Sequence, residues 1–114
     1  MSGSGHVAEQ LAGQYLTRQG LVIVARNYRC RGGEVDLICR DGATLVFVEV
    51  RLRSSGRFGG AAASITPRKQ ARIILAARHY LTGRAECLCR FDAVLLDVPD
   101  PARITWLRAA FDAG

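Results

Sequence analysis

Four charged side chains lie close together in two alternating segments of the chain. Glu34 and Asp36 belong to the first segment, and Glu49 and Arg51 to the second. Side chains on a strand alternate between its two faces, so an antiparallel hairpin formed by these segments places all four on one face. Facing carboxylates repel one another unless something neutralises them, and a divalent cation such as Mg²⁺ can do so. A metal site is therefore one interpretation of the pattern.

The turn between the two segments sets which carboxylates face each other. A four-residue turn over residues 41–44 places Asp36 directly opposite Glu49, whereas a two-residue turn on residues 41–42 would pair Glu34 with Glu49. In both registers the acids share one face. In the structural alternative to a metal site, Arg51 and neighbouring arginines neutralise the acids in a salt-bridge network on an exposed sheet face.

The positive charge of the chain is almost entirely arginine. Lys69 is the only lysine among sixteen basic residues, so any chemistry that needs an amine has to use it. Sixteen basic residues against ten acidic ones give a net charge of +6, with a pI near 9.8. This balance favours polyanionic partners such as nucleic acid. A chain of 114 residues, 49% of them hydrophobic, is expected to form a single domain over residues 1–114.

Helices and short strands of one α/β domain are expected to position these side chains. Apolar residues at helical spacing predict helices over residues 7–18 and 66–81. Alternating or β-branched apolar runs predict strands over residues 21–25, 34–40, 45–51, 91–98 and 103–108. In the hairpin, the side chains expected to face the core are Val35, Leu37, Cys39, Val46, Val48 and Val50.

Helix positions outside the hairpin are further candidates for the same site. Glu9 lies at the border of the apolar stripe of the first helix, where its carboxylate can reach over the edge of a packed sheet. Lys69 and Gln70 lie in the first turn of the second helix, where unpaired backbone donors favour an anion such as phosphate. Thr66 and Pro67 begin this helix as N-cap and first residue. In the alternative interpretation, Gln70 caps the backbone of a strand or loop and Glu9 is a solvated side chain.

Residues 53–64 lack periodicity and are rich in glycine, so we expect a mobile loop. Arg53 and Arg57 could hold a phosphate backbone there while Phe58 stacks on a base, unless the loop is an ordinary solvated connection. Residues 28–33 are expected to be a basic connection between strands, and residues 1–5 a flexible N-terminus.

The sequence begins without the basic opening and apolar stretch of a secretory signal, and no apolar run approaches the length of a membrane span. We therefore expect a cytoplasmic protein with no membrane partner. Its cysteines match no common zinc pattern and are expected to stay reduced in that compartment. They are Cys30, Cys39, Cys87 and Cys89.

Five short blocks, taken in order, resemble the YraN family of small bacterial proteins. The blocks are Gly5-His6-Val7-Ala8-Glu9, Gly33-Glu34-Val35-Asp36-Leu37-Ile38, Val46-Phe47-Val48-Glu49-Val50-Arg51, Lys69-Gln70 and Arg90-Phe91-Asp92. The resemblance covers residues 5–98, nearly the whole chain. It implies a predicted endonuclease of the PD-(D/E)xK superfamily, related to archaeal Holliday-junction resolvases. The implied fold is restriction-endonuclease-like, with a mixed central β-sheet flanked by α-helices.

The resemblance also implies roles for individual residues. Asp36 and Glu49 would hold Mg²⁺ or Mn²⁺, and Glu9 would contribute to the metal site directly or through water. Gln70 would orient a phosphate or a water. The metal would activate water and steady the charge that accumulates on the phosphate oxygens as a phosphodiester is cut.

Arg51 departs from the nuclease motif, which has lysine at this position. Arginine stays charged in any protein environment and cannot act as a general base. Either Lys69 supplies the missing amine while Arg51 stabilises a charged transition state, or catalysis is slow or absent. The residues predicted to contact nucleic acid are Arg53, Arg57, Phe58, Arg68 and Lys69.

Three functions are compatible with these patterns. The first is a metal-dependent endonuclease, a hydrolase acting on phosphodiesters in structured or branched DNA. The second is a nucleic-acid-binding protein with a degenerate nuclease site, and the third is an interaction domain whose acids are paired with arginines. A homodimer is expected by analogy with resolvases, because their substrate has matching two-fold symmetry.

Overall fold

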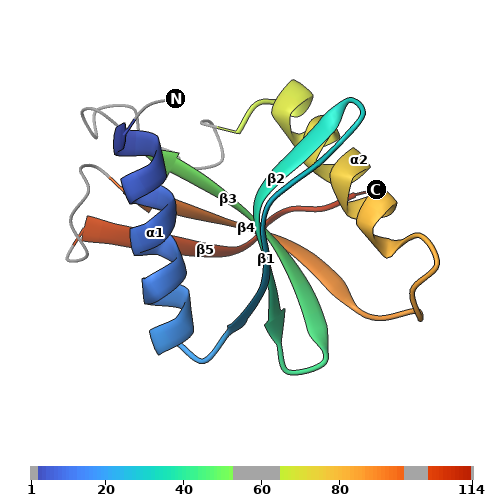
Figure 1. Ribbon diagram of the computed structural model, residues 1–114, viewed down its shortest axis with the longest axis horizontal. Coiled ribbons are helices and arrows are strands. Elements are labelled where there is room, and N and C mark those ends of the chain that lie inside the picture. Colours follow the sequence, from blue (N-terminus) through green and yellow to red (C-terminus); the bar gives the residue numbers. More distant parts are fainter. Residues whose placement is uncertain (1–2, 53–64, 97–102, 114) are drawn as a thin grey trace.

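A single mixed β-sheet between two helices makes up the described part of the computed structural model, which covers residues 3–52, 65–96 and 103–113. The elements are α1 (Gly3–Arg18), β1 (Val22–Cys30), β2 (Gly33–Asp41), β3 (Thr44–Leu52), α2 (Pro67–Leu81), β4 (Cys89–Leu96) and β5 (Ile104–Phe111). The strands lie side by side in sequence order, β3 and β4 are parallel, and the other neighbours are antiparallel. The two helices cover opposite faces of the sheet (Figure 1). This architecture confirms the predicted α/β class and is compatible with a restriction-endonuclease-like fold.

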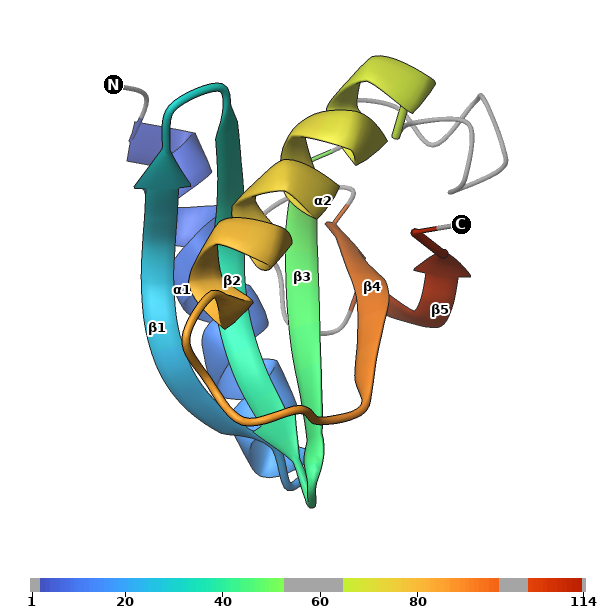
Figure 2. The same cartoon turned by 90° about the vertical axis from the view of Figure 1, so that its right-hand side faces the viewer.

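Both faces of the central strands are buried, one under each helix. On the α1 side, Ala8, Ala12 and Leu16 pack against a cluster that includes Leu37, Cys39, Val46 and Val48. On the α2 side, Ile73, Ala76 and Ala77 pack against Val35, Ile38 and Phe47. Figure 2 shows α2 lying across β2 and β3, with α1 behind the sheet. Within the described residues, neither helix is long and apolar enough to cross a membrane.

The expected alternation of β2 is interrupted at Asp36. Leu37 and Cys39 face α1 as predicted, but the prediction for Val35 is wrong, because its side chain packs in the cluster under α2. Residues two apart on a regular strand share a face. The strand is therefore irregular between Val35 and Leu37, where pairing with β3 also ends.

Strand β1 is longer than predicted. It runs to Cys30, so only Arg31 and Gly32 remain of the expected connection over residues 28–33. Tyr28 and Cys30 pack at the border of the α2-side cluster, and the arginines between and after them point to the exposed side. Gly32 takes a φ of +82°, which allows the tight turn into β2. The predicted loop over residues 53–64 lies outside the described residues.

Helix α2 begins as predicted, with Thr66 as its N-cap and Pro67 as its first residue. The Lys69 backbone N–H donates to Thr66 Oγ1 at 3.1 Å. The helix ends at Leu81, and Gly83 follows with a φ of +80°. Because this cap fixes the first turn, it also fixes the position from which the Lys69 side chain leaves the helix.

Gly33 allows α2 to lie very close to the start of β2. A Cβ at this position would lie 2.6 Å from the Arg72 carbonyl oxygen and 2.9 Å from the Ala76 backbone nitrogen. Both contacts are to helix backbone, so no side-chain rotation could relieve them. The absence of a side chain at Gly33 thus allows the middle of α2 to lie against the strand that carries Glu34 and Asp36.

We expect Gly33→Ala to lower the free energy of unfolding by about 1–3 kcal/mol, the usual cost of overpacking, and to displace α2. Denaturant unfolding measures the first effect, and amide NMR shifts of Arg72 and Ala76 measure the second. Gly42→Ala is the control, because a Cβ there meets nothing within 4 Å and only the φ of +61° is strained. Wild-type stability and unshifted α2 amides in Gly33→Ala would contradict this account.

Candidate functional site

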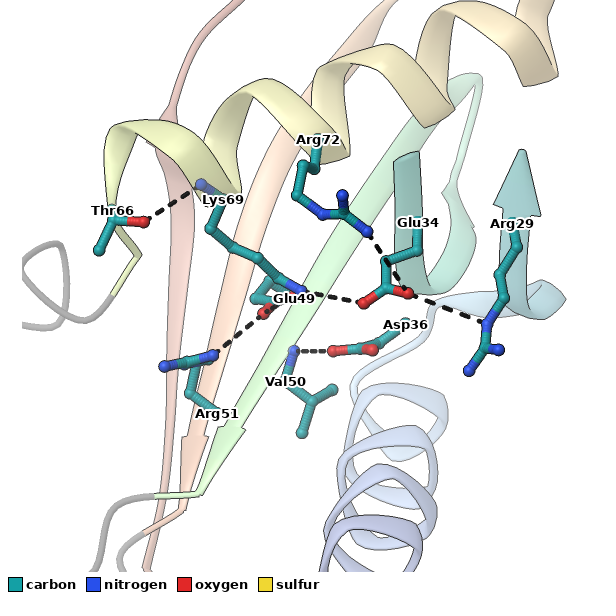
Figure 3. A network of polar contacts seen from close by, with 9 residues as sticks. All are labelled: Arg29, Glu34, Asp36, Glu49, Val50, Arg51, Thr66, Lys69 and Arg72. Carbon is teal, nitrogen blue, oxygen red and sulfur yellow. Dashed lines mark hydrogen bonds and ion pairs between the residues drawn. The ribbon is translucent and has the colours of Figure 1, made fainter. Parts of the chain in front are cut away.

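The hairpin register brings Asp36 and Glu49 together. The pairs run from Asp41 with Thr44 to Leu37 with Val48, which is the register predicted for a turn over residues 41–44. Pairing ends there, and the next residues on the two strands are Asp36 and Glu49, whose carboxyl groups interact directly. The Val50 backbone N–H donates to Asp36 Oδ2 at 2.8 Å (Figure 3). The Asp36 side chain thus replaces the backbone carbonyl that would accept this hydrogen bond in a regular ladder.

Glu49 is almost fully buried, at 2% exposure, and its two oxygens differ sharply. Oε2 lies 3.6 Å from Lys69 Nζ and 3.6 Å from Arg51 Nη1. Oε1 is buried without a hydrogen-bond partner among the described residues. Burial and the neighbouring Asp36 carboxylate raise the pKa of Glu49 to about 8, although Lys69 and Arg51 act in the opposite direction.

Glu34 is neutralised by cations from two elements. Lys69 Nζ donates to Glu34 Oε2 at 3.2 Å, and Arg29 and Arg72 approach Glu34 Oε1 to 3.9 and 4.0 Å. The hydrogen bond from Lys69 lowers the pKa of Glu34, and the charges of Lys69, Arg72 and Arg29 act in the same direction. Figure 3 shows Lys69 between Glu34 and Glu49, reaching down from the first turn of α2.

The salt-bridge network expected as the alternative to a metal is therefore present, but it is incomplete. It neutralises Glu34 and contacts one oxygen of Glu49, while Glu49 Oε1 is buried next to the Asp36 carboxylate with no donor among the described residues. A buried polar atom without a partner is costly. No three His, Cys, Asp or Glu side chains of the described residues are arranged to hold a metal by themselves. Mg²⁺ needs only one or two carboxylates when water and substrate phosphates complete its shell, so Asp36 and Glu49 fit such an ion.

Glu9, on α1, also lies close to Asp36. Burial and the nearby Asp36 carboxylate raise the pKa of Glu9, while a hydrogen bond with Asn27 acts against this shift. Asn27 itself has a φ of +50°, which is uncommon for a residue other than glycine. Glu9 thus approaches Asp36 from α1, and its role as a further metal ligand stays a prediction.

The remaining predicted site residues divide into three groups. Gln70 Nε2 donates to the Ile65 carbonyl oxygen at 2.9 Å, which is the backbone-capping alternative. Arg68 lies exposed in the first turn of α2 beside Lys69. Arg53, Arg57 and Phe58 lie outside the described residues.

Arg29 and Arg72 are the contributors that the sequence analysis missed. Arg72 follows Lys69 by three residues on α2, and this spacing places both on one helix face. That spacing is a usable signal for Arg72. Arg29 gave no such signal, because it belongs to the stretch that was expected to be a connection rather than part of β1.

The last block of the resemblance is structural in this chain. Asp92 is fully buried and accepts hydrogen bonds from Trp106 Nε1, the Ala109 backbone N–H and Arg90 Nε. Arg90 also pairs with Asp41 at 3.0 Å. These contacts tie β2, β4 and β5 together, away from the Asp36–Glu49 pair.

Comparisons with known proteins find one family. A family model described as "Uncharacterised protein family UPF0102" matches residues 8–96. The chain is similar to a UPF0102 protein of Methylobacillus flagellatus, with 54% identity over 113 residues that cover 99% of this chain and 100% of that protein. It is 57% identical over 109 residues to one of Dechloromonas aromatica, with 96% and 88% covered. A UPF0102 protein of Cupriavidus taiwanensis is 61% identical over 112 residues, with 96% and 82% covered.

The raised pKa of Glu49 predicts that the metal-free protein loses stability as the pH rises. The unfolded chain releases this proton near pH 4.5 and the folded chain near pH 8. Between these values the folded state holds more protons, so the free energy of unfolding falls with rising pH, by at most about 1.4 kcal/mol per pH unit. Urea unfolding from pH 5 to pH 8, in the presence of a chelator, measures this slope.

Glu49→Gln should flatten the pH dependence, because an amide of similar shape does not titrate. Glu86→Gln, at an exposed position, is the matched control and should keep the wild-type profile. If Glu49→Gln and wild type show the same slope over this pH range, the burial of the Glu49 carboxyl group is not what sets the slope.

Proposed function

The chain belongs to UPF0102, the YraN-like family. From this family membership and the carboxylate pair of the site, we propose that it is a metal-dependent endonuclease. Its proposed substrate is a phosphodiester in structured or branched DNA, and its proposed cofactor is Mg²⁺ or Mn²⁺. The substrate class rests on the resemblance to Holliday-junction resolvases and on the net charge of +6. A homodimer in the cytoplasm is part of the same proposal.

The unpaired Glu49 oxygen beside Asp36 is the observation that carries this proposal. A purely structural ion-pair network would be expected to satisfy its buried acid, as the contacts of Asp92 do on the other side of the sheet. Here Glu49 Oε1 has no partner among the described residues. Burying a charge is costly unless it is paired or coordinates a metal. Asp36 and Glu49 therefore offer carboxylate oxygens that a cation could bind.

Asp36 and Glu49 would hold the ion, which supplies a nucleophilic water at neutral pH and neutralises charge on the phosphate. The Val50 N–H fixes Asp36 through Oδ2, so this carboxylate is held in place before any ion binds. Lys69 and Arg51, both 3.6 Å from Glu49 Oε2, put two positive charges next to the pair. In phosphodiester cleavage such charges stabilise the negative charge that grows on the phosphoryl oxygens.

Nucleic-acid binding without cleavage is the second candidate function. Arg51 favours it, because arginine stands at the position where the nuclease motif has lysine and it cannot take up a proton. In that case the basic side chains around Glu34 would bind phosphates, and affinity would fall steeply with salt. Binding without turnover separates this function from the first.

Asp36→Asn tests the endonuclease. Calorimetric titration of Mg²⁺ and Mn²⁺ should give saturable uptake by the wild type, and a nicking assay on branched DNA should give metal-dependent cleavage. Both should be lost in Asp36→Asn, because one of two carboxylates loses its charge. Asp41→Asn is the control on the same strand, since Asp41 pairs with Arg90 and not with the site. No metal uptake by the wild type, with DNA binding retained, would favour the second function.

Lys69→Ala tests whether the single lysine replaces the amine of the motif. We expect nicking to fall by about 10²–10³-fold, as for other groups that stabilise transition-state charge. Lys69→Arg keeps the charge but not the ability to lose a proton, so its rate distinguishes charge stabilisation from proton transfer. Unchanged cleavage and unchanged DNA affinity in Lys69→Ala would show that Lys69 has no part in the reaction.

A further inference from the structure

A pocket of about 270 Å³ lies beside the first turn of α2, next to the carboxylate pair. Among the described residues it is lined by Arg51, Thr66, Arg68, Lys69 and Arg72. Four of these five side chains carry a positive charge, and none of them is acidic. Arg51 comes from the end of β3 and the other four residues from α2 or its cap. The fold therefore brings side chains of two elements to the same pocket.

The positive charge of this pocket is only partly neutralised. Lys69 contacts Glu34 and Glu49, Arg51 contacts Glu49, and Arg72 approaches Glu34. Two carboxylates thus form ion pairs with three of the four cations. The fourth cation, Arg68, forms no ion pair or hydrogen bond with the part of the chain that the structure describes. With both carboxylates ionised, the cluster keeps a net charge of about +2, which attracts anions.

The donors around the pocket suit phosphate oxygens. Arginine presents several N–H groups in a planar fork that matches phosphate geometry, and three arginines line this space. The Thr66 hydroxyl accepts from the Lys69 backbone N–H and keeps its own proton for donation. A carboxylate ligand would be held by the same charges, but it would lack the third oxygen that a phosphate offers to several donors at once.

We propose that this pocket is a phosphate subsite, separate from the Asp36–Glu49 pair, that binds one phosphate group of the substrate. Lys69 and Arg51 line the pocket and also contact Glu49, so they separate a phosphate bound there from the buried carboxylate. The identity of the substrate as nucleic acid rests on the proposed function. Binding of a phosphate group by the pocket rests on the pocket alone.

Arg68→Ala is the variant that tests the subsite, because Arg68 has no contact with the carboxylate network. Arg78→Ala is the matched control, since it removes an exposed arginine from the last turn of the same helix. The probe is inorganic phosphate, titrated at constant ionic strength into protein kept metal-free with a chelator. Amide NMR shifts of Arg68 and Lys69 report binding in the pocket.

We expect saturable shifts in wild type and in Arg78→Ala, and binding about tenfold weaker in Arg68→Ala because one charge-assisted contact is lost. Equal weakening in both variants would mean a general charge effect, and it would overturn the subsite. No saturable shift in the wild type, or full affinity in Arg68→Ala, would overturn it as well.

Oligonucleotides with and without a 5′-terminal phosphate then identify the source of the phosphate group. If the pocket takes a chain end, removal of that phosphate should weaken binding as much as Arg68→Ala does. If it takes an internal phosphodiester, both oligonucleotides should bind equally and Arg68→Ala should weaken both. Inorganic phosphate binding without any DNA binding would uphold the subsite and count against the proposed DNA substrate.

Discussion

The burial of the Glu49 carboxyl group next to the half-buried Asp36 carboxylate is the constraint on which the rest of the site depends. Coulomb repulsion between ionised carboxylates grows as water is removed, and Glu49 is only 2% exposed. Two sets of contacts reduce the cost of this repulsion. The Val50 N–H holds Asp36 where the β2–β3 ladder ends, and Lys69 and Arg51 bring positive charge to Glu49. Glu49 Oε1 still has no hydrogen-bond partner among the described residues, and this cost is the observation behind the proposed cation site.

Placing the Lys69 ammonium at this pair depends on how α2 starts and how closely it approaches the sheet. A lysine side chain has four flexible methylenes, so the position of its ammonium is well defined only if the backbone that carries it is fixed. Thr66 caps the first turn through the Lys69 N–H, and Gln70 ties the same turn to the Ile65 carbonyl. Gly33 removes the side chain that would otherwise keep α2 away from β2. Glu34, beside Gly33, then holds the ammonium from the opposite side.

Features set by local periodicity could be predicted from the sequence, and features set by contacts between distant elements could not. A period of two was enough to place the acids of the hairpin on one face, because a slip of one residue would turn the apolar side chains away from the core. It left two registers open, and the structure adopts the one predicted for a turn over residues 41–44. The reversal of Val35 was not predictable, since it accompanies a hydrogen bond from the backbone to the Asp36 carboxylate. The approach of Arg72 to Glu34 likewise depends on how α2 packs on the sheet. The full length of β1 was also not predicted, because its second half contains exposed arginines, and a polar, basic sequence of this kind is typical of a loop.

Arg51 on β3 and Lys69 on α2 together supply the positive charge next to Glu49. Arg51 and Lys69 approach the same oxygen, Glu49 Oε2, at the same distance of 3.6 Å from two different elements. Two positive charges, one from each element, therefore lie next to this oxygen. The two groups are not equivalent, because only an ammonium can lose a proton in a protein, while a guanidinium remains charged and offers several donors. Here the helix carries the ammonium and the strand carries the guanidinium.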